Sequence, residues 1–474
     1  MAHNAPGVGF AVPRGGRKDA MTDLDDRTDP GPDPQSAPTP WHLLGNFAPV
    51  ADELVVDDLV VDGEIPDQLA GTYVRNGFNP RHADSEHWFC GHGMVHAVDL
   101  ADGRARYRNR YVRTPYWEQG QATIAQLISP ANSPANTHIV PHGGGLLALE
   151  EVHAPYRMGL DLDTIGMETF DGAVTGAFTA HPKTCPVTGE MLAFGYSLVE
   201  RPYITYYRIS PTGEMLQVEP IDIPNPVMMH DWNVTRNHVV FMDLPVRFDM
   251  DLVGAEAAPF RFDRYAGARL GVMPRDGGND DVVWHEIEPC FVFHPVNAHE
   301  DGDDIVLTVC RQRSAMDAGF GDFGEQAELW RWTIDTAAGT VREEQLDDRR
   351  ADFPRIDDRL IGLPARYGYV GELVPGQGQP AFGSEIYKYD LQTGTAETHD
   401  CGAGMHIGEP VFAPRTPDGP EDDGWMMAFV YDAAEDRSEL RVVDAAAMTD
   451  DPVARIRMPQ RIPYGAHGSW LPGD

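Results

Sequence analysis

Seven segments of similar pattern recur along this chain, and they constrain its fold more than any other feature. Each consists of a β-rich run, a turn containing Gly, Asp or Thr, and a second β-rich run, and their starts lie about 50 to 62 residues apart. Strands joined by DG, TG or GG turns are typical of β-hairpins. The seven segments begin at Val95, Tyr156, Tyr206, Ala268, Glu328, Glu385 and Glu439.

A multi-stranded unit repeated at this period predicts an all-β fold, a seven-bladed β-propeller. The alternative is an ordinary β-sandwich with many hairpins. The composition also favours many short strands, because 48 glycines and 39 prolines are high numbers for a helical protein. We expect residues 41–474 to form a single propeller domain. The less regular stretches 110–135, 231–260 and 312–326 are expected to form loops and short helices, a dome over the active-site face.

Residues 1–40 contain no apolar segment of the length found in signal peptides, and we expect them to be a disordered leader. No stretch approaches the roughly 18 apolar residues of a membrane span. Five widely spaced cysteines without a CxxC pair predict neither a disulfide framework nor a zinc site, and they favour a reduced, cytoplasmic protein. The net charge of −37 argues against nucleic acid as a partner and is typical of an acidic, solvated surface.

One ionisable residue follows each hairpin and precedes the next. After the first step of 30 residues, the spacings between successive members are 49, 64, 58, 57 and 58 residues, close to the hairpin period. The inner strand of each propeller blade lines the central channel, so these side chains would converge on the axis. A single histidine beside Pro or Gly is usually structural, but four in phase with a blade repeat favour a common site. The seven residues are Glu151, His181, His230, His294, Asp352, Glu409 and His467.

The motifs around these residues carry a family resemblance. In order along the chain they are RNGFNP, HWFCGHGMVHAVDL, YRNRYVRT, AHPKTCPVTGE, MMHDWNVT, FMDLPV, FHPVNAHE, DFPRID, GEPVF and PYGAHGSW. From about Trp41 to Pro472 the chain resembles the carotenoid cleavage oxygenase family, which also includes lignostilbene dioxygenases and the retinoid isomerohydrolase. The resemblance implies a seven-bladed propeller with a helical dome and one non-haem Fe(II) per subunit, held by His181, His230, His294 and His467.

The resemblance also implies that Glu151, Asp352 and Glu409 accept hydrogen bonds from the outer nitrogens of ligand histidines. Such acceptors fix the tautomer and the direction of an imidazole. Family members add O2 across a conjugated double bond, which gives two carbonyl products, and a dry channel would protect the reaction from water. Thr137 matches a threonine that lies beside an open iron position in some members; a capping or turn hydroxyl is the alternative role.

Three departures from the family pattern affect these expectations. Cys90 and His92 replace two aspartates of the usual HWFDGDGM, and we expect neither to be a metal ligand. Asp352 replaces the more typical glutamate, and its shorter side chain predicts contact with its histidine through water. Glu150 stands where lignostilbene-type members carry a phenol-binding lysine; it is a candidate for the substrate tunnel and could accept a hydrogen bond from a hydroxyl. Tyr116 and Trp117 lie near the position of a phenol-binding tyrosine and are candidates for a substrate tunnel or for the core.

The leading hypothesis from the sequence is an Fe(II)-dependent dioxygenase that cleaves a C=C bond of a carotenoid or apocarotenoid. Its expected partners are O2, an apolar conjugated alkene and, transiently, a membrane surface contacted by the dome, with no nucleic acid and no obligate protein partner. The alternatives are a stilbene- or phenylpropene-cleaving enzyme, an isomerase on the same scaffold, and a metal-free binding propeller.

Overall fold

The computed structural model describes residues 39–82, 85–120, 122–127, 129–248, 259–317, 322–324, 326–376 and 379–473. Residues 40–474 form one compact unit. The predicted disordered leader lies almost entirely outside the described residues. No helix in the described part of the chain is long and apolar enough to cross a membrane.

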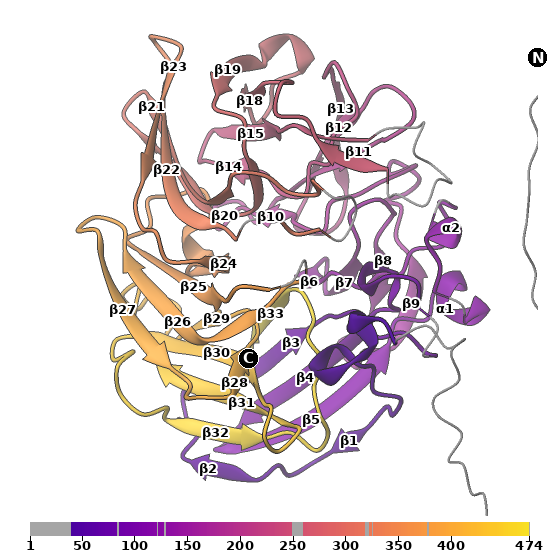
Figure 1. Cartoon of the computed structure of the whole chain (residues 1–474), viewed down its shortest axis with the longest axis vertical. Coiled ribbons are helices and arrows are strands. Elements are labelled where there is room, and N and C mark those ends of the chain that lie inside the picture. Colours follow the sequence, from indigo (N-terminus) through magenta and orange to yellow (C-terminus); the bar gives the residue numbers. More distant parts are fainter. Residues whose placement is uncertain are drawn as a thin grey trace, which may run out of the picture. The chain divides into compact units, whose positions relative to one another are not determined.

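Seven sheets surround a common centre, which confirms the predicted seven-bladed propeller (Figure 1). We number the blades along the chain. Blade 1 holds β1 (Val55–Val56), β5 (Arg104–Tyr111), β4 (Met94–Ala101), β3 (Gly71–Arg75) and β33 (Gly468–Pro472). Blade 2 holds β6 (His138–His142), β7 (Gly145–Leu149), β8 (Tyr156–Met158) and β9 (Thr164–Met167). Blade 3 holds β10 (Lys183–Thr184), β11 (Met191–Tyr196), β12 (Ile204–Ile209) and β13 (Met215–Ile221).

The remaining blades repeat this order. Blade 4 holds β14 (Asn233–Val234), β15 (His238–Asp243), β18 (Ala268–Pro274) and β19 (Val283–Ile287). Blade 5 holds β20 (Phe291–Asp301), β21 (Asp304–Gln312), β22 (Glu328–Asp335) and β23 (Thr340–Gln345). Blade 6 holds β24 (Ala351–Arg355), β25 (Tyr367–Leu373), β26 (Phe382–Asp390) and β27 (Thr395–Asp400). Blade 7 holds β28 (Met405–Ile407), β29 (Val411–Pro414), β30 (Gly424–Asp432), β31 (Arg437–Asp444), β32 (Ala454–Arg457) and β2 (Val61–Gly63).

Each hairpin predicted from the sequence is an antiparallel pair on the outer side of its blade. The pairs are β4–β5, β8–β9, β12–β13, β18–β19, β22–β23, β26–β27 and β31–β32. The segment after each outer hairpin therefore leads into the next blade. This order explains why residues in phase with the hairpins reach the centre.

Two strands from the ends of the described chain close the ring. The last strand, β33, pairs with β3 in an antiparallel register that places Thr72 opposite Leu471. Near the start of the described chain, β2 pairs with β32 of blade 7. The C-terminal strand thus forms the inner edge of blade 1, and His467 immediately precedes it.

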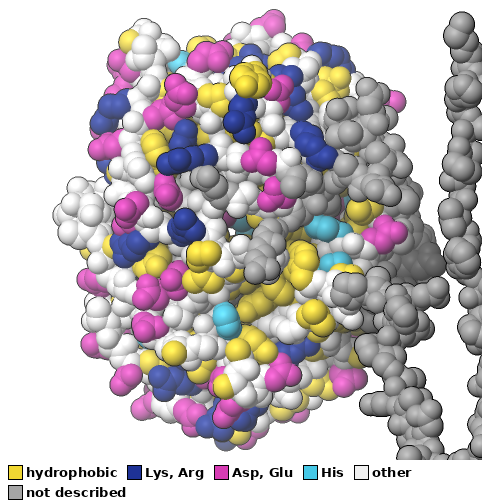
Figure 2. Space-filling view, viewed as in Figure 1, with side chains coloured by type: hydrophobic (Ala, Val, Ile, Leu, Met, Phe, Trp, Pro, Cys, Tyr) yellow, Lys and Arg dark blue, Asp and Glu magenta, His cyan; other side chains and the backbone are white. Residues whose placement is uncertain are grey.

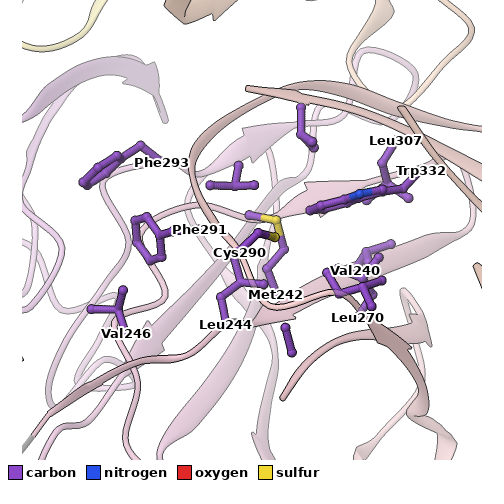
Figure 3. Close-up of a cluster of buried hydrophobic side chains, with 14 of the residues drawn as sticks. Val240, Met242, Leu244, Val246, Leu270, Cys290, Phe291, Phe293, Leu307 and Trp332 are labelled. Carbon is purple, nitrogen blue, oxygen red and sulfur yellow. The ribbon is translucent and has the colours of Figure 1, made fainter. Parts of the chain in front are cut away.

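The hydrophobic core lies between neighbouring blades and leaves the axis to other side chains. The cluster between blades 4 and 5 includes Val240, Met242, Leu270, Leu307 and Trp332, all at most 1% exposed (Figure 3). Side chains from the facing sheets of the two blades interdigitate, as they do between packed β-sheets in general. Truncating a fully buried aromatic residue of this kind typically costs about 3–5 kcal/mol.

Two short helices lie in the stretch 110–135, which was predicted to belong to the dome. Helix α1 (Pro115–Gln119) begins after Thr114, whose hydroxyl accepts from the Trp117 N–H, and ends at Gly120 in the left-handed conformation. Helix α2 (Ile124–Leu127) follows. The short 3-10 helices are η1 (Trp41–Leu43), η2 (Gly45–Phe47), η3 (Trp88–Cys90), η5 (Asn279–Asp281) and η6 (Asp358–Leu360).

The stretch 231–260 differs from its predicted dome role. It contains β14 and β15 of blade 4, and β16 (Val246–Phe248), which pairs with β17 (Phe260–Phe262). Each of its strands is only two to six residues long, which is too short for a pattern to be recognised from the sequence.

Candidate metal centre

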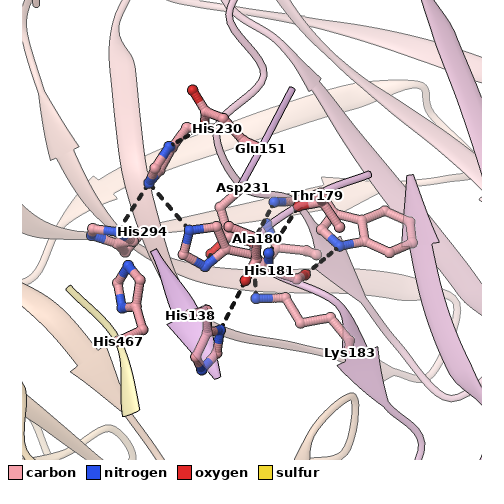
Figure 4. A network of polar contacts seen from close by, with 12 residues as sticks. His138, Glu151, Thr179, Ala180, His181, Lys183, His230, Asp231, His294 and His467 are labelled. Carbon is pink, nitrogen blue, oxygen red and sulfur yellow. Dashed lines mark hydrogen bonds and ion pairs between the residues drawn. The ribbon is translucent and has the colours of Figure 1, made fainter. Parts of the chain in front are cut away.

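Four histidines stand at or near the start of inner strands. His181 and His230 shortly precede β10 and β14, His294 lies within β20, and His467 directly precedes β33. One ring nitrogen from each can be chosen so that all four lie within 4.8 Å of one another. The sequence-predicted set is therefore brought together, with the rings turned toward one another (Figure 4). All four are buried or half-buried.

The inner nitrogens of these rings lie close to one another. The Nε2 atom of His230 is 3.2 Å from Nε2 of His181 and also 3.2 Å from Nε2 of His294. The ring centroids of His467 and its neighbours His181 and His294 are 4.6 and 4.7 Å apart. Such a group of imidazoles has the ligand type and spacing of a transition-metal site.

Three carboxylates contact the outer nitrogens of three of these rings. Each histidine donates from Nδ1: His230 to Glu151 Oε2 at 2.6 Å, His294 to Asp352 Oδ1 at 2.9 Å, and His467 to Glu409 Oε1 at 2.8 Å. A carboxylate on Nδ1 holds the proton there, so Nε2 carries a bare lone pair. Facing lone pairs repel one another unless a cation lies between them, and this donor set therefore fits a metal ion.

The electrostatics of His181 and His467 also favour metal binding. Burial, together with the neighbouring histidines, lowers the pKa of His181 and His467 well below the ordinary value. Burial also lowers the pKa of His294, but the adjacent Asp352 carboxylate outweighs it and raises that pKa. Neutral imidazole is the form that binds metals.

The Asp352 contact corrects one expectation. Its carboxylate reaches His294 directly at 2.9 Å rather than through water. The register of β24 against β25 shifts between Asp352 and Arg355, and Phe353 between them has a φ of 56°. A bulge of this kind bends its strand and re-aims the side chains beside it.

Glu151 reaches the site from a different part of its blade than the others. It lies two residues after β7, the second strand of blade 2, and not at the inner strand β6. From this turn it accepts the Nδ1–H of His230 on one oxygen, and a hydrogen bond from the Tyr196 hydroxyl at 2.9 Å on the other. The different origin explains the short first spacing of 30 residues in the sequence.

Thr137 lies just before β6, and the structure ties its main chain to the site. Its carbonyl accepts from the His467 N–H at 2.9 Å. Its hydroxyl is 3.0 Å from Asn136 Oδ1, to which it donates. This hydrogen bond engages the hydroxyl proton, and the threonine's main chain holds that of His467; its role beside an open metal position stays a prediction.

The three predicted tunnel residues have contacts of different kinds. Tyr116 is 0% exposed and donates to the Cys90 carbonyl at 2.7 Å, so it is a core residue and does not line an open tunnel. The guanidinium groups of Arg81 and Arg113 lie over the Trp117 ring, at 4.0 and 3.8 Å from its centroid. Glu150 accepts from His153 Nδ1 at 2.5 Å.

Cys90 and His92 are buried and do not belong to the group of four histidines. The Nδ1 atom of His92 accepts from the Arg81 N–H at 3.2 Å. Burial is the main cause that raises the pKa of the Cys90 thiol to about 12, which keeps it protonated. Both side chains pack locally, and that neither is a metal ligand stays a prediction.

Two parts of the site were missed from the sequence. Asp231 lies beside His181, with Oδ2 3.4 Å from Nδ1, and it pairs with Lys183 at 2.8 Å. His138, the first residue of β6, faces the Ala180 carbonyl at 2.8 Å and the Gly468 carbonyl at 3.3 Å. Lys183 and Asp231 belong to the HPK and HDW segments, which are visible in the sequence. Only the fold brings their side chains together.

Aromatic side chains extend from the four histidines and were also missed. Phe353 lies 5.1 Å from His294 and 5.5 Å from Phe382, and Phe293 lies 5.3 Å from His230 and 6.0 Å from Phe323, each between ring centroids. Phe323 and Phe353 pack against the cluster around Trp88. In the space-filling view, hydrophobic and histidine side chains are visible near the centre of the face (Figure 2). The surroundings of the site are apolar and suit an apolar molecule.

Comparison with known proteins finds relatives that cover nearly the whole chain. A family model described as "Retinal pigment epithelial membrane protein" matches residues 47–472. A "Carotenoid cleavage oxygenase" of Mycobacterium tuberculosis is 36% identical, covering 91% of this chain and 97% of the relative. A "Carotenoid 9,10(9',10')-cleavage dioxygenase 1" of Pisum sativum is 37% identical, covering 93% of this chain and 91% of the pea protein.

Solved structures are similar over the same range. A lignostilbene dioxygenase of Pseudomonas brassicacearum superposes with a TM-score of 0.85 at 30% identity, covering 92% of this chain and 100% of the other. A cobalt-substituted apocarotenoid oxygenase of Synechocystis superposes with a TM-score of 0.79 at 28% identity, covering 90% of this chain and 97% of the other.

Proposed function

The chain belongs to the carotenoid cleavage oxygenase family, and from this premise we propose that it is a non-haem Fe(II) dioxygenase that cleaves a conjugated C=C bond of a carotenoid or apocarotenoid into two carbonyl products. The observation that carries the proposal is the convergence of four imidazoles whose ligand atoms lie within 4.8 Å of one another.

His181, His230, His294 and His467 would hold the ion, one per chain. Their inner nitrogens face a common point, and carboxylates keep protons on three of the outer nitrogens. When bound there, ferrous iron would supply the coordination positions at which dioxygen is activated for cleavage of the alkene.

The protein's own residues would bind the substrate and exclude water. Phe293 and Phe353 lie directly against ligand histidines, with ring centroids 5.3 and 5.1 Å away. They would stack on a flat conjugated chain and keep its double bond beside the histidines. The apolar wall would also keep water from reactive species.

The surroundings of Glu150 favour a substrate without a phenol. Lys183 and Lys388 are the lysines of the described residues, and both are in ion pairs, with Asp231 and Asp422. Glu150 is occupied by His153. A phenolate would therefore find no free ammonium group here, whereas a polyene needs only apolar contacts.

A stilbene-cleaving activity is the second candidate, because the lignostilbene dioxygenase structure superposes closely on this chain. An isomerase that uses the same scaffold is the third.

The five cysteines are buried and form no disulfide, which supports the proposed cytoplasmic, reducing location.

A substrate panel under labelled oxygen tests the proposal. Iron-loaded protein is incubated with apocarotenals and with hydroxystilbenes under ¹⁸O₂, and the products are identified by mass spectrometry. We expect cleavage of apocarotenals with ¹⁸O in the carbonyl products, and none with His467→Ala. Turnover of stilbenes alone would overturn the substrate class, and rearrangement without O2 uptake would identify an isomerase.

A further inference from the structure

One outer nitrogen of the four histidines faces a carboxylate that the predicted set does not include. Nδ1 of His181 lies 3.4 Å from Oδ2 of Asp231. The other oxygen of Asp231 is 2.8 Å from Lys183 Nζ and accepts from the Trp232 N–H at 2.7 Å. The Asp231 side chain is 3% exposed and that of Lys183 is 19% exposed. A pair so buried needs a reason, because removing two charges from water is costly.

The sequence places this pair between two ligand segments. Lys183 lies two residues after His181 at the start of β10, and Asp231 directly follows His230 before β14. Trp232 adds a second contact, since its indole N–H donates to the His181 carbonyl at 3.0 Å. The HPK and HDW motifs of neighbouring blades 3 and 4 therefore hold each other in place (Figure 4).

The charges around the four histidines balance a divalent ion, and the Asp231–Lys183 pair leaves that balance unchanged because its own net charge is zero. Lys183 on Asp231 and Arg355 on Glu409 carry the positive charges in contact with the carboxylates. Asp358, on the far side of Arg355, is 50% exposed and is screened by water. Two positive charges against four negative ones leave a net charge of −2, equal and opposite to that of a divalent cation. The four carboxylates are Glu151, Asp231, Asp352 and Glu409.

We propose that Asp231 and Lys183 are a positioning pair for the metal centre: Asp231 directs His181, and Lys183 offsets the extra negative charge so that the site as a whole is neutral with a divalent ion. This inference rests on the proposed metal-binding function. Asp231 then completes a set of one carboxylate for each histidine.

Three variants separate the role of charge from a merely structural role. Asp231→Asn keeps the size and removes a negative charge, Lys183→Met keeps the length and removes a positive charge, and the double variant restores the balance. Binding of Co²⁺ to metal-free protein is measured by calorimetry. Thermal unfolding of the metal-free proteins shows whether each variant is folded.

We expect Asp231→Asn to weaken Co²⁺ binding roughly 10- to 100-fold, the usual effect of losing a partner of a ligand histidine. Lys183→Met should bind Co²⁺ at least as tightly as the unmodified protein. The double variant should bind more tightly than Asp231→Asn alone. Lys388→Met is the matched control, since Lys388 is also a buried lysine paired with an aspartate, Asp422, but lies in blade 6. It should leave Co²⁺ binding unchanged.

A double variant that binds Co²⁺ no better than Asp231→Asn would overturn the charge-balance role, and so would weaker binding by Lys183→Met. If the unmodified protein bound no Co²⁺, the proposed metal-binding function itself would fail. The two failures are therefore distinguishable.

Discussion

Glu409 is the carboxylate whose replacement has the most informative expected result. Its side chain is 3% exposed and receives three donors. Nδ1 of His467 donates to Oε1 at 2.8 Å, and the Gly468 N–H and an Arg355 N–H donate to Oε2 at 2.8 and 3.3 Å. A carboxylate satisfies all three because both of its oxygens accept.

Glu409→Gln can satisfy only one side of this arrangement, because an amide has one oxygen and one NH2 group. With the amide oxygen toward Gly468, the NH2 group faces Nδ1 of His467 and forces the proton onto Nε2, the nitrogen that would bind metal. With the amide reversed, the Gly468 and Arg355 donors lose their acceptor. A buried donor without a partner costs about 1–3 kcal/mol. Metal affinity should fall roughly 10- to 100-fold.

The assay combines urea unfolding of the metal-free protein with calorimetric titration of Co²⁺. Glu300→Gln is the matched control, because Glu300 also accepts from a histidine Nδ1, that of His238 at 2.9 Å. It does not belong to the four-histidine site and should lower stability without affecting metal binding. If Glu409→Gln bound Co²⁺ as tightly as the unmodified protein, the tautomer argument would be refuted.

Four further substitutions test other parts of the structure. Gly468→Ala should cost at least about 1–3 kcal/mol and lower metal occupancy, because the added Cβ would lie 2.4 Å from a carbonyl oxygen of β3; normal stability in urea would contradict this. Burial lowers the pKa of His153, but the charge and hydrogen bond of Glu150 outweigh burial and raise that pKa overall. The pair therefore stabilises the fold fully below the ordinary pKa of histidine, and this stabilisation is lost as pH rises through the pKa of the folded state. The stability cost of His153→Gln should therefore be larger at pH 5.5 than at pH 9, and a cost that grew with pH would be contrary to this sign. Tyr116→Phe should lower the free energy of unfolding by about 1 kcal/mol, for the loss of one hydrogen bond, and leave the cleavage products unchanged. Phe353→Ala should lower kcat/KM for apolar substrates. The opposite pattern would indicate that Tyr116 lines the substrate tunnel.

The sequence was sufficient for the blades and for the convergence of the four histidines, because both follow from one period. Each outer hairpin feeds the inner strand of the next blade, so residues in phase with the hairpins meet at the axis. Glu151 shows the limit of this reasoning. Like the other six residues, Glu151 stands between two hairpins in the sequence. It lies after the second strand of blade 2, however, and reaches the site from a turn.

The contacts missed from the sequence depend on pairings between blades. Asp231 lies 50 residues after His181 in the chain, and nothing in its own motif indicates which ring it faces. His138 meets carbonyls of two other blades, those of Ala180 and Gly468. The direct contact of Asp352 with His294 lies beside a register shift in β24 that no local pattern indicates.

X-ray absorption at the iron edge of anaerobically reconstituted protein is the most direct test of the four-histidine iron site. With four histidine ligands, we expect one Fe(II) per chain, only nitrogen neighbours from the protein, and the outer scattering of four imidazole rings. His467→Ala should reduce that scattering to three rings or abolish iron binding. A sulfur neighbour, a carboxylate oxygen in place of an imidazole, or unchanged scattering in the His467 variant would contradict the four-histidine centre.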